Sequence, residues 1–242
     1  MSIRILATIG IRSRGVAPSV SSLLTGIVSY WKLDETSGNA IDELGANNGT
    51  LVNGAWCTQG VSGKIGKAFE FTAANFGTGY DMGSGLQSGT SSWSASLWVK
   101  MINTIGRAYF IQWGADSGLD GLRVESDTTY HGAATFAGTS SSWSVTGDSS
   151  VDLSDGNWHH IVVVADRSGL LQIYTDTIAG STSNISSISS DNISNSTNFT
   201  IIKNFGVATG VIVDEMGLWN RALTGTEIST LYNSGTGKSY PF

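Results

Sequence analysis

The sequence of 242 residues contains little cysteine, little proline and few charged side chains. Cys57 is the single cysteine, so the chain has no intrachain disulfide, and its cysteine content does not indicate an oxidising compartment. Proline occurs only twice, and charged residues make up 13% of the chain. No apolar run approaches the roughly 20 residues that cross a bilayer, so we expect no membrane span.

The charge of the chain is acidic and unevenly distributed. A net charge of −6 and a pI near 4.9 argue against a nucleic-acid partner that is bound through its phosphates. Residues 1–26 carry Arg4, Arg12 and Arg14 and no acidic residue, whereas residues 27–242 carry ten basic and nineteen acidic side chains, a net charge of −9. We therefore interpret residues 1–26 as an N-terminal arm. Because its arginines interrupt the first apolar run, we do not expect a cleaved signal peptide.

Glycine is abundant, with 31 residues, and short apolar runs recur between Gly, Ser, Thr and Asn. In the run WSASLWVKM, residues 93–101, apolar and other side chains alternate, which is typical of a strand. Similar runs follow at residues 158–165 and 211–219, and residues 177–200 are expected to form long loops or an exposed edge strand. This spacing predicts one all-β domain built as a two-sheet sandwich.

One short helix is predicted near the C-terminus. Thr224 precedes Glu227 by three residues, which is the pattern of a capping box. Ile228 and Leu231 follow at helical spacing, and Gly235 comes just after the predicted end. We expect this helix to close one end of the sandwich.

Six segments, taken in order, resemble the LamG-like jelly-roll domains of the concanavalin A-like lectin/glucanase superfamily. They are VSYWKLDETSGNAIDELGANNGTLVNGAW, GVSGKIGKAFEF, WSASLWVK, DGNWHHIVVVAD, LQIYTD and VDEMGLWNRALTGTEISTLY, and they cover roughly residues 26–232. One departure is IYTDT, residues 173–177, which lacks the glycine that usually follows the aspartate of this hairpin.

The resemblance implies an all-β fold in which two antiparallel sheets pack face to face as a jelly-roll sandwich. Residues 27–242 would form this domain, with one short C-terminal helix, and residues 1–26 would precede it as the arm. Members of the superfamily include sugar-binding modules, adhesion domains and a minority of glycosidases, so the fold alone does not decide the function.

The adjacent histidines His159 and His160 could suggest a catalytic or metal site. In a strand, successive side chains point to opposite faces, so His160 shares a face with Val162 whereas His159 shares the other face with Ile161. They cannot bind one metal together. We interpret this segment as a central strand of the scaffold.

No pair of carboxylates with the spacing of a glycosidase is found. A retaining glycosidase holds two carboxyl groups roughly 5 Å apart. Glucanases of the superfamily supply them as Glu-x-Asp-x-x-Glu, and in the nearest match here, Glu125 and Asp127 are followed by Tyr130 at the final position. No Gly-x-Ser-x-Gly motif accompanies the histidines either. We therefore predict that the protein is not an enzyme.

A structural calcium ion is one interpretation of two acidic segments. The loop DELGANNG offers Asp42 and Asn47, and the segment VDE offers Asp214 and Glu215. Hard oxygen ligands from two segments suit Ca²⁺, and many relatives carry such an ion at the rim of the sandwich. The alternative has equal weight: the loop residues form turns, and Asp214 is a buried cap of a loop.

Three aromatic residues in or near polar loops are candidate ligand-binding residues: Trp113, Tyr130 and Trp143. Sugars dock on aromatic faces with polar neighbours, and residues 130–148 mix aromatics with small hydroxyl residues, as adaptable binding surfaces do. The alternative for each of them is packing in the core or within a loop.

These observations predict a noncatalytic structural or binding module, expected on the virion surface of a tailed bacterial virus as a capsid decoration or fibre component. Residues 1–26 would contact other virion proteins or a second copy, which makes a homo-oligomer the expectation, and the body would bind a cell-surface glycan. The alternative is a secreted or cell-surface bacterial carbohydrate-binding or adhesion domain. A glycoside hydrolase is the third hypothesis.

Overall fold

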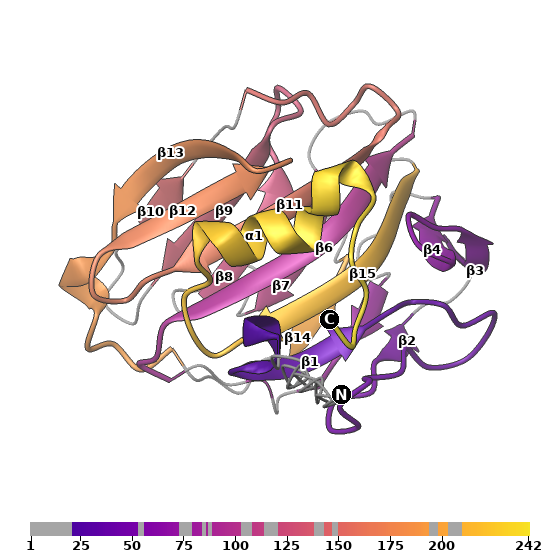
Figure 1. Ribbon diagram of the computed structural model, residues 1–242, viewed down its shortest axis with the longest axis horizontal. Helices are drawn as coiled ribbons and strands as arrows, with labels where there is room; N and C mark the ends of the chain where they lie inside the picture. The colour runs from indigo at the N-terminus through magenta and orange to yellow at the C-terminus, as the bar shows by residue number, and fades with distance from the viewer. Residues whose placement is uncertain are drawn as a thin grey trace, which may run out of the picture.

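The computed structural model describes residues 21–52, 56–72, 79–83, 86, 89–102, 108–113, 121–137, 150–193, 198–202 and 210–242, together with the backbone of residues 143–146. These residues form two antiparallel sheets, of eight and seven strands, that pack face to face (Figure 1). The predicted all-β jelly-roll sandwich is confirmed.

The eight-stranded sheet has the order β13-β12-β11-β6-β15-β4-β3. These strands are, in that order, Ile178–Asn184, Leu170–Thr175, Trp158–Ala165, Trp93–Met101, Val211–Trp219, Lys67–Phe71 and Cys57–Ser62. The eighth strand, β1 (Ile27–Trp31), pairs with the second half of β15, whereas β4 pairs with its first half. One edge of β15 is therefore shared between two strands, and the ladder to β6 shifts its register where they meet, between Asp214 and Gly217.

The seven-stranded sheet has the order β10-β9-β8-β7-β14-β5-β2. Its strands are Trp143–Thr146, Gly132–Ala137, Gly121–Ser126, Tyr109–Trp113, Phe199–Ile201, Gly79–Asp81 and Thr50–Val52. The strands β3 and β2 lie at edges of the two sheets, and the chain passes from β2 to β3 through residues 53–56. The main core lies between the sheets and is rich in aromatic side chains, among them Trp31, Phe69, Phe110, Phe136 and Phe199.

The eight-stranded sheet buries a second apolar layer on its outer face. Val162 and Val164 of β11 point to this layer, whereas Ile161 and Val163 point into the main core. The helix α1 (Gly225–Tyr232) covers the outer layer with Ile228 and Leu231. Figure 1 shows α1 in yellow, lying across β6 and β11.

The predicted helix is confirmed, including its capping box: the side chain of Thr224 accepts from the backbone of Glu227, and the side chain of Glu227 accepts from the backbone of Thr224. Its expected position at one end of the sandwich is wrong. The apolar outer face of β11 and Trp219 of β15 would otherwise be exposed, so α1 packs over that face instead.

Residues 21–26 belong structurally to the body, although the sequence placed them in the arm. The 3₁₀ helix η1 (Ser22–Leu24) buries the side chain of Leu23. The backbone carbonyl oxygen of Leu23 accepts a hydrogen bond from Trp219 Nε1 at 2.7 Å. Arg221 holds the same segment by donating to Thr25 O at 2.7 Å and to Ser22 O at 2.9 Å. Residues 1–20 of the predicted arm lie outside the described residues.

Candidate functional site

Asp214 and Glu215 lie at the irregularity of β15 where β4 gives way to β1. Glu215 has a φ of 50°, which removes it from the regular ladder and accompanies the register shift there. Its carboxylate accepts a short hydrogen bond from the hydroxyl of Tyr30. Asp214 Oδ2 accepts from the backbone N–H of Ile65 at 3.0 Å. The two neighbouring carboxyl groups thus connect separate segments of the sandwich.

Burial controls the charge of this pair. Asp214 and Glu215 are 0% and 2% exposed. Burial, together with the charge of Glu215, raises the pKa of Asp214 from 3.8 to about 9, against the backbone hydrogen bond from Ile65. Burial also raises the pKa of Glu215 to about 7, although the hydrogen bond from Tyr30 opposes this. The raised pKa favours the protonated form of Asp214 at neutral pH.

Asp42 organises the loop between β1 and β2 through backbone amides. Its Oδ1 accepts from the N–H of Tyr30 at 3.0 Å and Leu44 at 3.1 Å, and its Oδ2 accepts from Ala46 at 3.2 Å and Asn47 at 3.0 Å. The side chain of Asn47 donates to Ser29 Oγ at 2.8 Å, and its carbonyl oxygen accepts from Trp31 Nε1 at 2.8 Å. This geometry matches the alternative interpretation of the loop residues as turn formers.

The four residues proposed as calcium ligands make hydrogen bonds to other parts of the chain. The oxygens of Asp42 are occupied by four N–H groups, and the buried Asp214 accepts from the backbone N–H of Ile65. Within the described ranges, no three His, Cys, Asp or Glu side chains gather closely enough to hold a metal. A calcium ion stays a prediction, and the amide contacts of Asp42 count against it.

The two histidines occupy opposite faces of β11, as their spacing predicts. His160 lies under α1, where its ring packs against Trp98 at 5.0 Å and Tyr232 at 6.1 Å between ring centroids. Its Nε2 lies 2.8 Å from Ser96 Oγ, but both residues are fully buried. Burial lowers the pKa of His160 to about 3. This serine and histidine pair is inaccessible to a substrate and supports the scaffold.

His159 has a different environment, because it bridges two aspartates. Its Nδ1 lies 2.7 Å from Asp176 and its Nε2 lies 3.0 Å from Asp155. Burial opposes protonation, but the two hydrogen bonds outweigh burial and raise the pKa of His159 above its ordinary value. His159 therefore holds the turn before β11 to the turn after β12.

The carboxylates of the glucanase-like segment are not arranged as a catalytic pair. Glu125 is buried in β8 and only 4% exposed. Asp127 lies in the β8–β9 turn, where its Oδ1 accepts from the backbone of Thr129 at 2.7 Å and of His131 at 3.0 Å. Asp127 thus shapes a turn, and Tyr130 follows it with a φ of 64°.

The candidate ligand-binding aromatics do not share one site. Trp113 is the last residue of β7 and pairs with Leu122, near the start of β8. Trp143 lies near the same end of β8, because it pairs with Ala137 of β9, which pairs with Gly121. Tyr130 lies in the turn at the other end of β8, about 17 Å away at 3.4 Å per residue. Trp113 is buried, and Tyr130 is half-buried against the main core. Nothing is described of the Trp143 side chain.

Trp56 is an exposed aromatic residue that the sequence analysis did not select. It lies between β2 and β3 and is 40% exposed. Ile41, Leu44 and Val52 are also exposed, so four of the six exposed large apolar side chains in the described ranges come from residues 41–56. In the sequence Trp56 follows soon after the apolar residues Leu51 and Val52, and its exposure alone distinguishes it from the other tryptophans.

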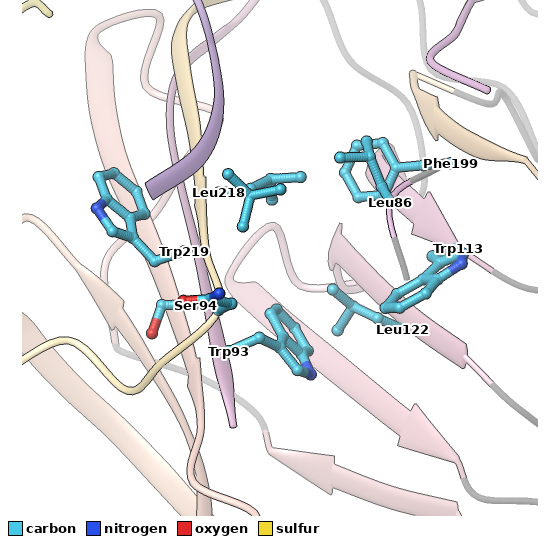
Figure 2. Close-up of a pocket in the computed structure, with 10 residues that line it drawn as sticks. Leu86, Trp93, Ser94, Trp113, Leu122, Phe199, Leu218 and Trp219 are labelled. Carbon is cyan, nitrogen blue, oxygen red and sulfur yellow. The ribbon is translucent and has the colours of Figure 1, made fainter. Parts of the chain in front are cut away.

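A small apolar pocket opens between the sheets, where β15 ends and β6 begins (Figure 2). Its volume is about 50 Å³. Its walls come from both sheets and are mainly aromatic and aliphatic, with Trp93, Trp113, Leu122, Phe199, Leu218 and Trp219. The exposed Asn220 and the half-buried Val28 border it. Trp113, one of the predicted aromatics, lines this pocket.

Comparisons with known proteins agree with this fold. A sequence profile described as the concanavalin A-like lectin/glucanases superfamily matches residues 76–229, well over half of the chain. The resemblance predicted from the sequence is therefore confirmed. No curated protein sequence matches the chain.

Several solved structures share the fold at low sequence identity. The binding domain of Paraclostridial Mosquitocidal Protein 1 has a TM-score of 0.70 and 15% identity, over 87% of this chain and 52% of that one. The binding domain of botulinum neurotoxin DC, solved with rat synaptotagmin II, has a TM-score of 0.66 and 13% identity, over 86% and 52%. A Trypanosoma rangeli sialidase complex with 2,3-difluorosialic acid has a TM-score of 0.65 and 16% identity, over 96% and 36%. The chain spans about half of the toxin domains and about a third of the sialidase.

The raised pKa of Asp214 predicts that stability falls as the pH rises. Between its ordinary pKa of 3.8 and about 9, the folded chain holds a proton that the unfolded chain releases. The contribution is therefore complete below pH 3.8 and is lost as the pH rises to about 9. We expect urea unfolding at pH 5, 7 and 9 to show a steep loss that Asp214→Asn flattens. Glu43→Gln, which alters an exposed carboxylate, is the control, and parallel profiles for both variants would contradict the assignment.

The amide contacts of Asp42 predict that it stabilises the loop with or without calcium. We expect Asp42→Ala to lower the free energy of unfolding by about 2 kcal/mol, because it leaves the buried N–H of Tyr30 and three part-buried N–H groups without an acceptor. The measurement is urea unfolding at pH 7 in calcium and in a chelator. An equal loss in both supports the amide role, whereas a loss that is confined to calcium would establish Asp42 as a metal ligand.

Proposed function

Because the chain belongs to the concanavalin A-like lectin/glucanase superfamily, we propose that it is a noncatalytic binding module that recognises a glycan or a receptor on a cell surface. The superfamily match and the sandwich fold support this proposal. Two of the structural neighbours are toxin binding domains, one of them solved with synaptotagmin II, and a third is a sialidase. At their low sequence identity these neighbours support the fold alone. The proposed class of ligand is argued from the exposed side chains of this chain.

The carboxylates support a noncatalytic role. A hydrolase of this fold needs two accessible carboxyl groups at opposite sides of the scissile bond. Here Glu125 is buried, Asp127 is bound to backbone amides, and Tyr130 stands where the second glutamate would be. The glycoside hydrolase hypothesis therefore has no support from the best candidate residues.

The observation that supports ligand binding most directly is the exposure of Trp56. Among the tryptophans whose side chains are described, five are buried, Trp158 is half-buried and Trp56 is exposed. An exposed indole offers a flat apolar face with one donor, the combination that stacks on a sugar ring or anchors a protein receptor. Trp56 lies between the edge strands β2 and β3 and is not part of the pocket between the sheets.

We propose a location on the virion surface of a tailed bacterial virus, as a capsid decoration or fibre component. The supporting feature is the basic segment of residues 1–20, joined to a body with a net charge of −9. Such a segment can attach the module to an acidic protein surface or to a second copy. The alternative is a secreted or cell-surface bacterial adhesion module. The described residues contain no helix that is both long and apolar enough for a transmembrane segment.

Removal of the exposed indole should reduce ligand binding. On a glycan array and a panel of bacterial surface extracts, we expect Trp56→Ala to weaken binding at least tenfold. Aromatic residues that a bound partner buries commonly contribute about 2 kcal/mol or more to the binding free energy. Leu170→Ala removes another exposed apolar side chain, on β12, and is the matched control. Equal binding by both variants would remove Trp56 from the site. Release of reducing sugar from a polysaccharide panel, lost in Glu125→Gln, would contradict the noncatalytic assignment.

The proposed location has its own test. We expect antibodies raised against the chain to label purified virus particles of the source culture in electron microscopy, and mass spectrometry of those particles to contain its peptides. Labelling of the bacterial surface in place of particles would favour the adhesion module and contradict the virion role.

A further inference from the structure

The imidazole of His159 lies between two carboxylates that belong to different segments of the chain. Its Nδ1 is 2.7 Å from Asp176, in the turn between β12 and β13, and its Nε2 is 3.0 Å from Asp155, in the turn before β11. An ionised carboxylate only accepts hydrogen bonds, so both contacts exist together only when both ring nitrogens carry a proton. A neutral ring has a single N–H and can donate to one aspartate only.

The surrounding charges favour the doubly protonated ring. Burial lowers the pKa of His159, but the hydrogen bonds and charges of Asp176 and Asp155 outweigh burial and raise the pKa above 6.5. Desolvation opposes the ionisation of Asp155, yet its hydrogen bonds with His159 and Asn157 lower its pKa to about 2. On β6, the residue that pairs with His159 is the uncharged Val99. The other titratable groups near this cluster act on its neighbours: Asp152 on Asp155, His131 on Asp152, Tyr232 on Asp176 and Lys64 on His160.

The two aspartates are held to different degrees by the rest of the chain. The Oδ1 of Asp176 accepts from the N–H of His160 at 2.8 Å, and the N–H of Asp176 donates to the carbonyl oxygen of His160 at 2.9 Å. The side chain of Asp155 is more exposed, at 41% against 19%, and its other hydrogen bonds among the described residues come from Asn157 in its own turn. A neutral ring therefore keeps its N–H on Nδ1 toward Asp176, and its bare Nε2 faces Asp155.

The turn between β12 and β13 depends on the contact that is kept. Asp176 and Thr177 have φ values of 50° and 70°, in the left-handed region that favours glycine, and Thr177 is β-branched. The hydrogen bonds of Asp176 to β11 hold this strained backbone in place, so we expect the turn to stay closed in either charge state of the ring.

We propose that His159 is a pH-sensitive switch: its charged ring holds residues 154–157 against β11, and loss of one proton releases them while the turn at Asp176 stays closed. Residues 154–157 can move between fixed ends, because Leu153 before them is fully buried and Trp158 after them begins β11. The contact is complete below pH 6.5 and is lost as the pH rises through the raised pKa of His159. This switch does not depend on the proposed ligand.

Spin labels on the full chain test this switch. In a Cys57→Ser background, Ser154→Cys carries the label in the moving turn, and Ser168→Cys carries it in the turn between β11 and β12 as the matched control. Both serines are exposed and donate to an aspartate two residues earlier, so the label removes the same contact in each. Between pH 5 and pH 9 we expect the mobile fraction at position 154 to rise about tenfold, because one charge-assisted hydrogen bond is lost. The midpoint should equal that of the His159 ring nitrogens in NMR, and the label at position 168 should not change.

Two further variants separate the switch from a general loosening of the fold. Asp155→Asn supplies an amide that can donate to the bare Nε2 of a neutral ring, so we expect the label at position 154 to stay immobile at both pH values. His159→Gln cannot donate to both aspartates and should leave the label mobile at both, with native near-ultraviolet circular dichroism as the folding check. The proposal is overturned by a label that does not respond to pH, by a midpoint that differs from that of His159, or by a response that persists in Asp155→Asn.

Discussion

The central strands of the eight-stranded sheet must bury both of their faces, and much of the structure depends on this constraint. The inner face of β11 contributes Ile161 and Val163 to the core between the sheets, and its outer face contributes Val162 and Val164 to the layer beneath α1. An antiparallel sheet commonly leaves one face to solvent. Here the helix, η1 and the C-terminal residue Phe242 cover the outer face, so segments from both sides of the sandwich in the sequence become part of the scaffold.

This double burial explains the polar residues that the strand carries. His160 faces the outer layer, where a charged imidazole would be costly, and its low pKa keeps the ring neutral between Trp98 and Tyr232. His159 lies at the end of the strand, where Asp155 and Asp176 compensate its charge. Two adjacent histidines thus have opposite protonation preferences because the strand places them in two different environments.

The parts of the fold that follow from local rules could be predicted from the sequence. Alternation along residues 158–165 assigned each histidine to its face, and the Thr224 and Glu227 pattern located the helix start within one residue. The position of α1 depends on which sheet face remains apolar after the sandwich forms, and that is a tertiary property. The irregularity at Asp214 was equally hidden, because it arises where β4 and β1 share one edge of β15.

Candidate sites were harder to predict for a physical reason. The sequence does not show whether the carboxylate of a loop aspartate faces a cation or the backbone amides around it. The carboxylate of Asp42 accepts hydrogen bonds from four such amides. Likewise, a tryptophan in a short apolar run is indistinguishable from its neighbours until burial is known, and so Trp113 was selected whereas Trp56 was not. Exposure and hydrogen-bond occupancy are both set by contacts between distant segments.

The location of the exposed Trp56 indicates where the binding specificity of such a module can change during evolution. The broad faces of β11 and its neighbours are committed to packing, so a substitution there costs stability before it can alter recognition. The stretch from Ile41 to Trp56 connects the two sheets at their edges and carries four exposed apolar side chains. Changes of these four exposed side chains leave the buried layers intact. When both faces of one sheet are covered, binding residues can vary most easily in the connections at the sheet edges, such as the one that contains Trp56.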